Sequence, residues 1–215
     1  MHLNAVIVLF SATCLLAALG IHLKPKDGPR ATDVNLVRDQ DPKREDRARW
    51  PAMVEVATPG VEHAALLENV GSWTVRSEMM GQRREGSATI TGIMGGRFIQ
   101  IEQEIASATR PIQTCIIIGF DQVTQRYQSV SMTSTETGIV TAEGSAQGKV
   151  IALRGQMQDT VAPQERRPFR MVMTQISGDA FRIDVYDSVP LAMASVDNPA
   201  GREFLVMTEV FTRKP

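Results

Sequence analysis

The sequence predicts an all-β protein: an antiparallel up-and-down β-barrel of about ten strands, closed on itself, with a short N-terminal helix plugging one end. From Trp73 onward, apolar and polar residues alternate in roughly ten short stretches, as in strands with one buried face. Short connections rich in Gly, Pro, Asp and Asn separate them, which favours antiparallel neighbours because parallel crossovers need about a dozen residues or more. The folded region opens on Gly-Ser-Trp at residues 71–73 and closes on Arg213, and these two ends are suited to pair.

The composition is that of one globular domain with a tail. The 215 residues are enough for a sizeable core, and a net charge of -1 gives no electrostatic case for nucleic-acid binding. The two cysteines, Cys14 and Cys115, do not suggest a disulfide framework, because Cys14 lies in an apolar N-terminal segment. Cys115 stands among isoleucines, which favours a small buried hydrophobe over a reactive thiol.

Residues 1–23 are predicted to be a signal peptide or a membrane anchor helix. Positions 5–23 carry no charge, a length that can span a bilayer core. The same stretch suits the apolar region of a signal peptide with Ala-Leu-Gly at 18–20 as the cleavage site, although no Lys or Arg precedes it. Lys24 and Lys26 follow it, which by the positive-inside tendency favours a cytoplasmic domain. Both alternatives predict a membrane-associated or exported protein, contacting membrane through residues 5–23.

Residues 24–56 are predicted to be a disordered charged and proline-containing linker, because they mix both charge signs and show no apolar period. The barrel domain is assigned to residues 57–215. It begins with a short helix that has Thr58 as the N-cap, Pro59 at the first helical position and Gly71 at the C-terminal stop.

Strands are expected near residues 72–80, 86–94, 97–106, 111–120, 126–134, 138–145, 149–158, 167–177, 180–187 and 202–213. In the ninth, Phe181, Ile183 and Val185 share one face, opposite Arg182 and Asp184. An open sheet of this size would leave two edges unpaired, so we expect it to close.

Several blocks of residues occur in a recognisable order. They are Pro-Gly-Val-Glu-His at 59–63, Gly-Ser-Trp-Thr-Val at 71–75, Met-Gly-Gly-Arg-Phe at 94–98, Gly-Phe-Asp at 119–121, Thr-Gly-Ile at 137–139 and the terminal run 203–214. Over about residues 57 to 215 the series resembles a bacterial family of unassigned role, domain-of-unknown-function family 1579. The resemblance implies a lipocalin-like β-barrel and brings no activity with it. The sequence departs from the family pattern at Ser131 and Thr133, where the family commonly carries Trp and Asp.

Trp73 and Arg213 are predicted to close the barrel, with the guanidinium stacked over the indole at a gain of roughly 0.5–2 kcal/mol. The candidate ligand-binding residues are Arg97, Tyr127, Met171, Met173 and Tyr186. Arginine can hold an anionic head group, methionines adapt to varied apolar guests, and tyrosines can donate hydrogen bonds into a cavity. The plainer alternatives are a salt bridge for the arginine and core filling for the methionines.

These observations predict a membrane-tethered or exported barrel that binds a small apolar or amphipathic ligand. The alternative is a non-catalytic structural or interaction domain of the cell envelope with a filled barrel. No catalytic motif, metal set or cofactor motif is recognised, so we do not predict an enzyme. An enzyme that used His63, the one histidine of the folded domain, with Arg97 and a tyrosine would need these groups to share one cavity. The sequence does not indicate an oligomeric state.

Overall fold

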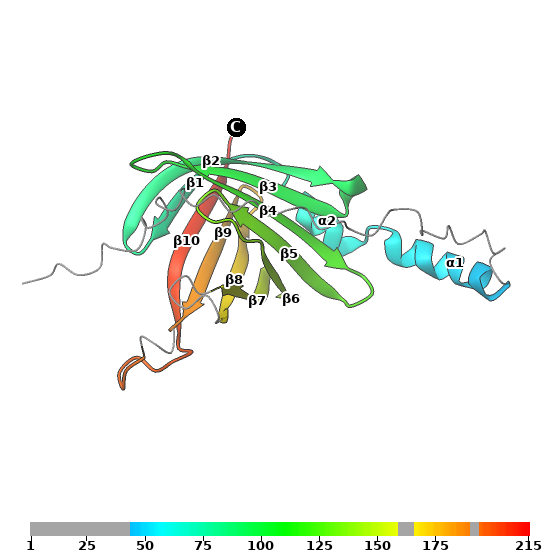
Figure 1. Ribbon diagram of the computed structural model, residues 1–215. Coiled ribbons are helices and arrows are strands. Elements are labelled where there is room, and N and C mark those ends of the chain that lie inside the picture. Colours follow the sequence, from blue (N-terminus) through cyan, green and yellow to red (C-terminus); the bar gives the residue numbers. More distant parts are fainter. Residues whose placement is uncertain (1–43, 159–165, 190–193) are drawn as a thin grey trace, which may run out of the picture. The chain divides into compact units, whose positions relative to one another are not determined.

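The structure is a computed structural model that describes residues 44–158, 166–189 and 194–215, with side chains from residue 51 onward (Figure 1). The chain divides into two compact units, Met1–Glu45 and Asp46–Pro215, and the strands all belong to the second. The apolar segment at 5–23 lies outside the described residues. Within the described part, neither helix is long and apolar enough to cross a membrane.

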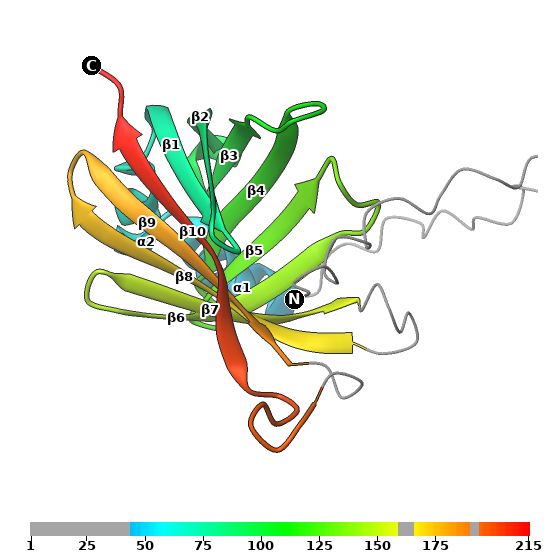
Figure 2. The same ribbon diagram turned by 90° about the vertical axis from the view of Figure 1, so that its left-hand side faces the viewer.

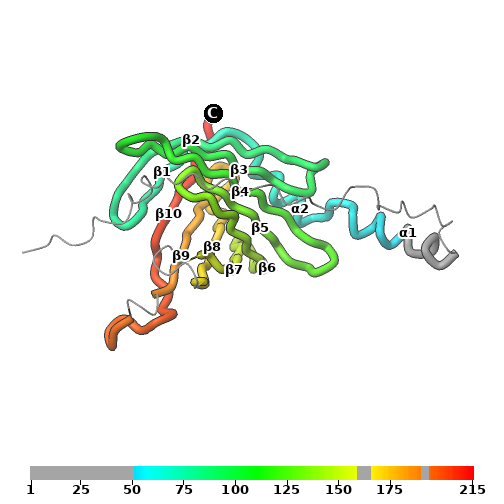
Figure 3. Tube along the Cα trace, in the orientation of Figure 1, coloured from blue at the N-terminus to red at the C-terminus, as the bar shows by residue number. Residues whose placement is uncertain are grey.

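The described strands form a closed antiparallel barrel, which confirms the predicted fold class. The ten strands are β1 (Gly71–Met79), β2 (Gln82–Ile93), β3 (Phe98–Ile105), β4 (Ile112–Asp121), β5 (Arg126–Thr133), β6 (Val140–Gln147), β7 (Val150–Gln158), β8 (Arg166–Ser177), β9 (Ala180–Ser188) and β10 (Glu203–Arg213). Each strand pairs with its neighbour in sequence, and β1 also pairs with β10. The tube in Figure 3 follows this up-and-down path. No strand edge is left open, so the barrel offers no template for further strand pairing.

Strand β2 begins four positions earlier than the sequence predicts. Met79 pairs with Gln82, so only Met80 and Gly81 connect β1 to β2. Both have positive φ, 50° for Met80 and 79° for Gly81, as the two central residues of a type I′ hairpin turn require. Methionine is an unusual residue at such a position, and the charged run that follows it reads as a loop. The strand start was therefore placed too late.

The seam, where β1 pairs with β10, brings the first and the last strand of the barrel together, as Figure 2 shows. Trp73 is the register partner of Arg213, whose Cζ lies 4.4 Å from the centre of the indole ring. Arg213 also donates from Nη1 to the carbonyl of Val70 at 2.8 Å and from Nη2 to the carbonyl of Glu68 at 2.7 Å. One side chain thus ties the last strand, the first strand and the preceding helix together.

The preceding helix is α2 (Val61–Leu67), which lies against β3 and β4 and closes that end of the barrel. Its N-cap is Gly60, whose amide donates to His63 Nδ1 at 3.0 Å. The predicted N-cap at Thr58 is therefore wrong. Thr58 Oγ1 instead donates to the carbonyl of Val54 at 2.8 Å, at the end of the helix before.

That earlier helix is α1 (Arg44–Ala57), and it falls within the range assigned to a linker. Its sequence is rich in Arg, Ala and Glu, which are good helix formers. Residues 51–57 are all exposed, so this part of the helix buries no apolar stripe. An apolar period is the signal by which the sequence would have predicted a helix here. The local structure of 44–56 differs from the expectation, while the boundary between linker and domain stays a prediction.

Candidate binding site in the open half of the barrel

The two ends of the barrel interior, or lumen, are built differently. We call the end covered by α2 the closed end and the opposite end, which carries the β1–β2 turn, the open end; Figure 2 looks onto the open end. At the closed end most of the inward-facing side chains are buried, although Phe120 and Ile151 are half-buried. Trp73, Phe181 and Phe211 are each 0% exposed. The Trp73 ring meets Phe181 edge-on at 4.9 Å, and Phe181 stacks on Phe211 at 4.3 Å.

Towards the open end, the inward-facing side chains on nearly every strand become half-buried. We call this set the open half, and it comprises Met79, Thr114, Ser131, Thr133, Val140, Met157, Arg167, Phe169, Val185, Asp187 and Met207. The members are mainly small, polar or flexible residues, in contrast to the aromatic and isoleucine side chains of the closed end. Solvent therefore reaches these inward side chains, whereas most of those at the closed end are buried.

Two buried polar residues, Glu209 and Gln103, lie where the filled part of the lumen meets the open half. Along β10, Glu209 follows the buried Phe211 and precedes the half-buried Met207 on the inward face. Gln103 Nε2 donates to Glu209 Oε1 at 2.7 Å, so the bond crosses the lumen past the two intervening strands β1 and β2. Ser77, the register partner of Glu209, also hydrogen-bonds this carboxyl.

Small residues on β2 leave room for this cross-lumen bond. The inward positions of β2 opposite Gln103 and Ile105 are Ala88 and Gly86. A Cβ at Gly86 would collide with the backbone carbonyl of Glu104, so a larger side chain there would push β2 and β3 apart. The close approach of these strands needs glycine at this position.

The Glu209 carboxyl is electrostatically unusual. It is 4% exposed, and burial raises its pKa above the ordinary value against the opposing effect of the hydrogen bonds from Gln103 and Ser77. Gln103 is 6% exposed, and its Oε1 has no hydrogen-bond partner among the described residues. A buried polar atom without a partner is costly, so a donor that reached this oxygen would be favoured.

A second polar pair faces the lumen nearer the open end. Arg167 on β8 and Asp187 on β9 form an ion pair at 2.8 Å, with both side chains mostly shielded. Asp187 also accepts from the amide of Ser188 at 2.7 Å. The open half thus combines apolar methionine, valine and phenylalanine surface with polar groups at two levels.

The structure separates the five predicted ligand residues. Tyr127, Met171 and Met173 face the lumen and are buried in the core, where burial raises the pKa of Tyr127 and the Glu62 charge adds to the effect. Tyr186 faces outward, with Arg170 Cζ 3.9 Å from its ring centre. Arg97 is exposed beside the turn between β2 and β3, and its Nη1 donates to the carbonyl of Met94 at 3.1 Å.

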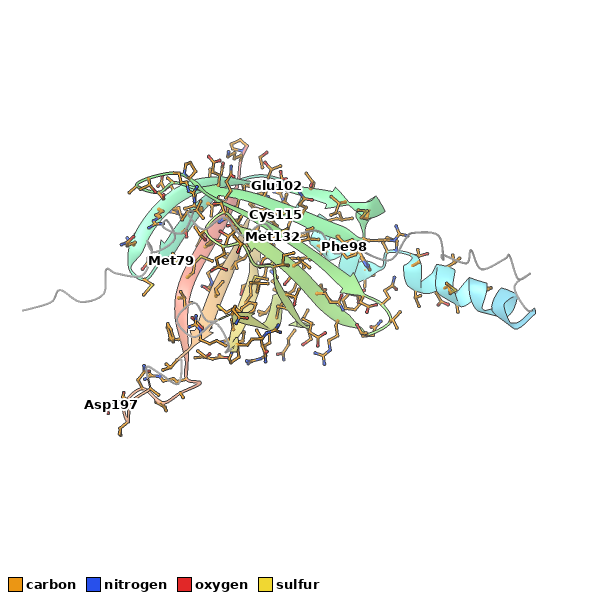
Figure 4. All side chains as sticks on the ribbon, in the orientation of Figure 1. Met79, Phe98, Glu102, Cys115, Met132 and Asp197 are labelled. Atoms are coloured by element: carbon orange, nitrogen blue, oxygen red, sulfur yellow. The ribbon has the colours of Figure 1, made fainter. Side chains whose placement is uncertain are left out.

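Two depressions lie outside the lumen. One, of about 230 Å3, lies beside α2 and is lined by His63 and Arg97 but by neither tyrosine. The other, of about 690 Å3, lies on the outer wall of β2 to β5. Figure 4 shows Glu102, Cys115 and Met132 in a row across it, and they are register partners on β3, β4 and β5. The thiol of Cys115 has its pKa raised by burial and, to a lesser extent, by Glu102.

Glu209 and Gln103 are not among the ligand residues predicted from the sequence, although both interrupt an apolar face. On β3 the inward positions read Ile99, Ile101, Gln103 and Ile105, and on β10 Glu209 lies between Met207 and Phe211. A polar residue in such a series is the signal that would have identified them. Ser131 and Thr133, the two departures from the family pattern, also face the lumen in the open half.

The fold and this site define a closed antiparallel β-barrel with a packed closed end and a polar, solvent-reached open half. The chain belongs to the family described as Protein of unknown function (DUF1579), whose sequence model matches residues 58–213.

No curated protein matches the chain in sequence. Among solved structures it is similar to a de novo designed fluorescence-activating β-barrel, with 14% identity and a TM-score of 0.38, covering 70% of this chain and 97% of that one. It is similar to EF1p2_mFAP2b bound to DFHBI, with 13% identity, a TM-score of 0.38 and coverage of 71% and 98%. Similarities of this degree carry no argument about function.

Proposed function

We propose that the barrel binds a small apolar or amphipathic ligand in its open half. The observation that supports this is the change in burial along single strands. On β1 the inward side chains run from Val75, 1% exposed, through Ser77 to the half-buried Met79. On β10 they run from Phe211 through Glu209 to Met207 in the same way. Ligand sites are usually concave and mainly apolar with a few polar groups that orient the guest, and the open half has this composition.

In this proposal the barrel binds its guest without transforming it. His63 and Arg97 line the depression beside α2, whereas Tyr127 faces the core on the inner side of β5. His63 Nδ1 accepts from the Gly60 amide, which engages that nitrogen in capping the helix. The depression that His63 and Arg97 share is thus lined by no tyrosine, which favours binding over the hypothesis of an enzyme that uses these three groups.

The test is a pair of tryptophan substitutions at adjacent positions of β6. Val140 faces the lumen and is half-buried, whereas Thr141 faces outward and is exposed. We expect Val140→Trp to fill part of the open half and to weaken binding of an apolar fluorescent dye at least about tenfold, while Thr141→Trp leaves it unchanged. Equal binding by the two folded variants, or no dye binding by the wild type, would contradict the proposal.

The alternative is an interaction domain that engages a partner through the outer wall. The depression over β2 to β5 favours it, because Met132 on its rim is 37% exposed and the neighbouring side chains are polar. Substituting Met132→Glu separates the two functions. It would abolish capture of a partner by the outer wall and leave dye binding in the lumen unchanged.

We also propose that residues 5–23 direct the protein to a membrane. The support is the uncharged length of this stretch in the sequence. Fractionation of cells that express the full chain or a chain without these residues tests it. Recovery of both in the same soluble fraction would contradict the proposal.

A further inference from the structure

The Glu209–Gln103 pair has a hydrogen-bonding capacity that the protein itself does not use. Both side chains are more than nine-tenths buried, with exposures of 4% and 6%. One N–H of Gln103 Nε2 donates to Glu209, and Gln103 Oε1 has no partner among the described residues. The pair therefore offers a third group more acceptors than donors: the amide oxygen and the remaining lone pairs of the carboxyl, beside the second N–H of Gln103.

Among the described residues, the Glu209 carboxyl also has no basic partner. None of the ion pairs recorded among the described residues includes Glu209. The inward-facing arginine of β2 nearest in register is Arg84, opposite Ser77, and its Nη2 donates to Gln82 at 2.9 Å. The other inward-facing arginine near the open end is Arg167, which is paired with Asp187. A buried carboxyl in this situation is stabilised by a cation or by protonation.

Adaptable apolar side chains separate this pair from the open end. Met79 and Met207 are register partners, one inward position nearer the open end than Ser77 and Glu209. Figure 4 shows Met79 at the end of the barrel that carries the β1–β2 turn. Unbranched thioethers repack around guests of different shape, so an aliphatic chain can lie along them while its head reaches the polar pair.

From these observations we infer that the open half takes an amphipathic ligand whose polar end is a primary amine, bound as an ammonium group by the Glu209 carboxylate and Gln103 Oε1. This inference rests on the proposed function and adds the chemistry of the head group. An ammonium group supplies several donors and the missing positive charge, whereas a fatty-acid carboxylate would place a second negative charge beside Glu209.

The amine is expected to bind more tightly as the pH rises through the Glu209 pKa, because ionisation creates its counter-charge. The other titratable groups that face the lumen are Arg84 on β2, Tyr127 on β5, Arg167 on β8 and Asp187 on β9. Asp187 is already paired with Arg167, 2.8 Å away. An alcohol of the same chain length carries no charge and is expected to show no such rise.

The experiment compares dodecylamine, dodecanol and dodecanoate by calorimetric titration of the purified protein. We expect dodecylamine to bind at least about tenfold more tightly than dodecanol, and dodecanoate to bind most weakly. Glu209→Gln removes the charge at nearly constant shape and is expected to bring the amine down to the affinity of the alcohol. Glu143→Gln, on the exposed outer face of β6, is the matched control and is expected to change nothing.

The outcomes separate the two proposals. If all three probes bind equally, or dodecanoate binds best, the head-group inference is wrong and the proposed function stands. If none binds, the proposed function fails and the inference with it. Should Glu209→Gln not fold, Gln103→Met removes the amide acceptor with little change in volume. Unchanged amine affinity in that variant would overturn the role assigned to Gln103 Oε1.

Discussion

The closed end and the open half are built from the same strands, yet their inward-facing residues differ in kind. On β1 the closed end contributes Trp73 and Val75, and the open half contributes Met79. On β10 the sequence runs from Phe211 at the closed end, through Glu209, to Met207. The first set excludes solvent, and the second admits it. The boundary between them is the hydrogen bond from Gln103 to Glu209.

We expect this difference to separate the residues that stabilise the barrel from those of the proposed binding site along the barrel axis. Fully buried aromatic and branched side chains supply the larger hydrophobic contribution, so the closed end should dominate the free energy of unfolding. Half-buried residues contribute less and tolerate substitution better, which is a property required of a surface that accommodates guests. Substitutions at matched positions of the two regions test this division.

The largest expected effect is at the closed end. Trp73→Ala removes a fully buried ring and the hydrogen bond from Nε1 to the carbonyl of Asn69 at 2.9 Å. We expect a loss of about 3–5 kcal/mol in the free energy of unfolding, measured by urea denaturation. Met79→Ala, on the same strand in the open half, should cost about 1 kcal/mol or less. Similar losses for the two variants would contradict the division.

The next effect concerns the seam. Arg213→Lys keeps the charge but cannot reproduce the fork that reaches the carbonyls of Glu68 and Val70, nor the stacking on Trp73. We expect a loss of about 1–3 kcal/mol in thermal or chemical unfolding. Arg76→Lys, at an exposed position of β1, provides the control and should lie within about 0.5 kcal/mol of the wild type. If Arg213→Lys leaves the free energy of unfolding unchanged, the contacts of Arg213 at the seam do not stabilise the protein.

The raised pKa of Glu209 predicts that the free energy of unfolding depends on pH. Because its pKa is raised in the folded state, the folded protein holds a proton that the unfolded chain releases. The wild type should therefore match Glu209→Gln most closely below about pH 4.5, the ordinary value of the group, and lose stability relative to it as the pH rises through the raised pKa. Denaturant titrations of both proteins at stepped pH measure the difference. A wild type that gains on the variant with rising pH would show that the carboxyl is stabilised in its charged form.

The smallest effect belongs to the outer surface of the open end. Arg154 Nη1 lies 2.7 Å from Glu203 Oε1, but the two side chains are 70% and 37% exposed. Arg154→Ala should change the free energy of unfolding by only about 0–1 kcal/mol, and added salt should erase the difference. A larger, salt-resistant loss would mean that this part of the barrel depends on its surface charges.

Much of the barrel follows from sequence period alone, because alternation and short turns leave few other arrangements. The clearest case is β9, where Phe181, Ile183 and Val185 face inward as their spacing predicts. The same spacing already places Tyr186 on the outward face with Arg182 and Asp184. Tyr186 was nevertheless named as a ligand candidate, although its parity with these two charged residues favours an outward position.

Other features of the barrel could not be predicted from the alternation of apolar and polar residues. On β5 the inward residues Ser129 and Ser131 are polar, while the outward residues Val130 and Met132 are apolar. Polarity thus points to the wrong face on this strand. The cross-lumen contact of Gln103 with Glu209 depends on the register of β10, β1, β2 and β3 together, and no local pattern contains that information.

The up-and-down order of the strands also has a consequence for the order in which the barrel folds. Nine of the strand pairings join consecutive strands through local connections, so each hairpin can form early and at small entropic cost. The contact between Arg213 and Val70, by contrast, joins positions 143 residues apart. Zipping the first strand to the last is therefore the non-local event that we expect to set the folding rate. During unfolding we expect the pairing of β1 with β10 to open first. A guest whose ammonium group is held by Glu209 on β10 and Gln103 on β3 would connect the two sides of this pairing.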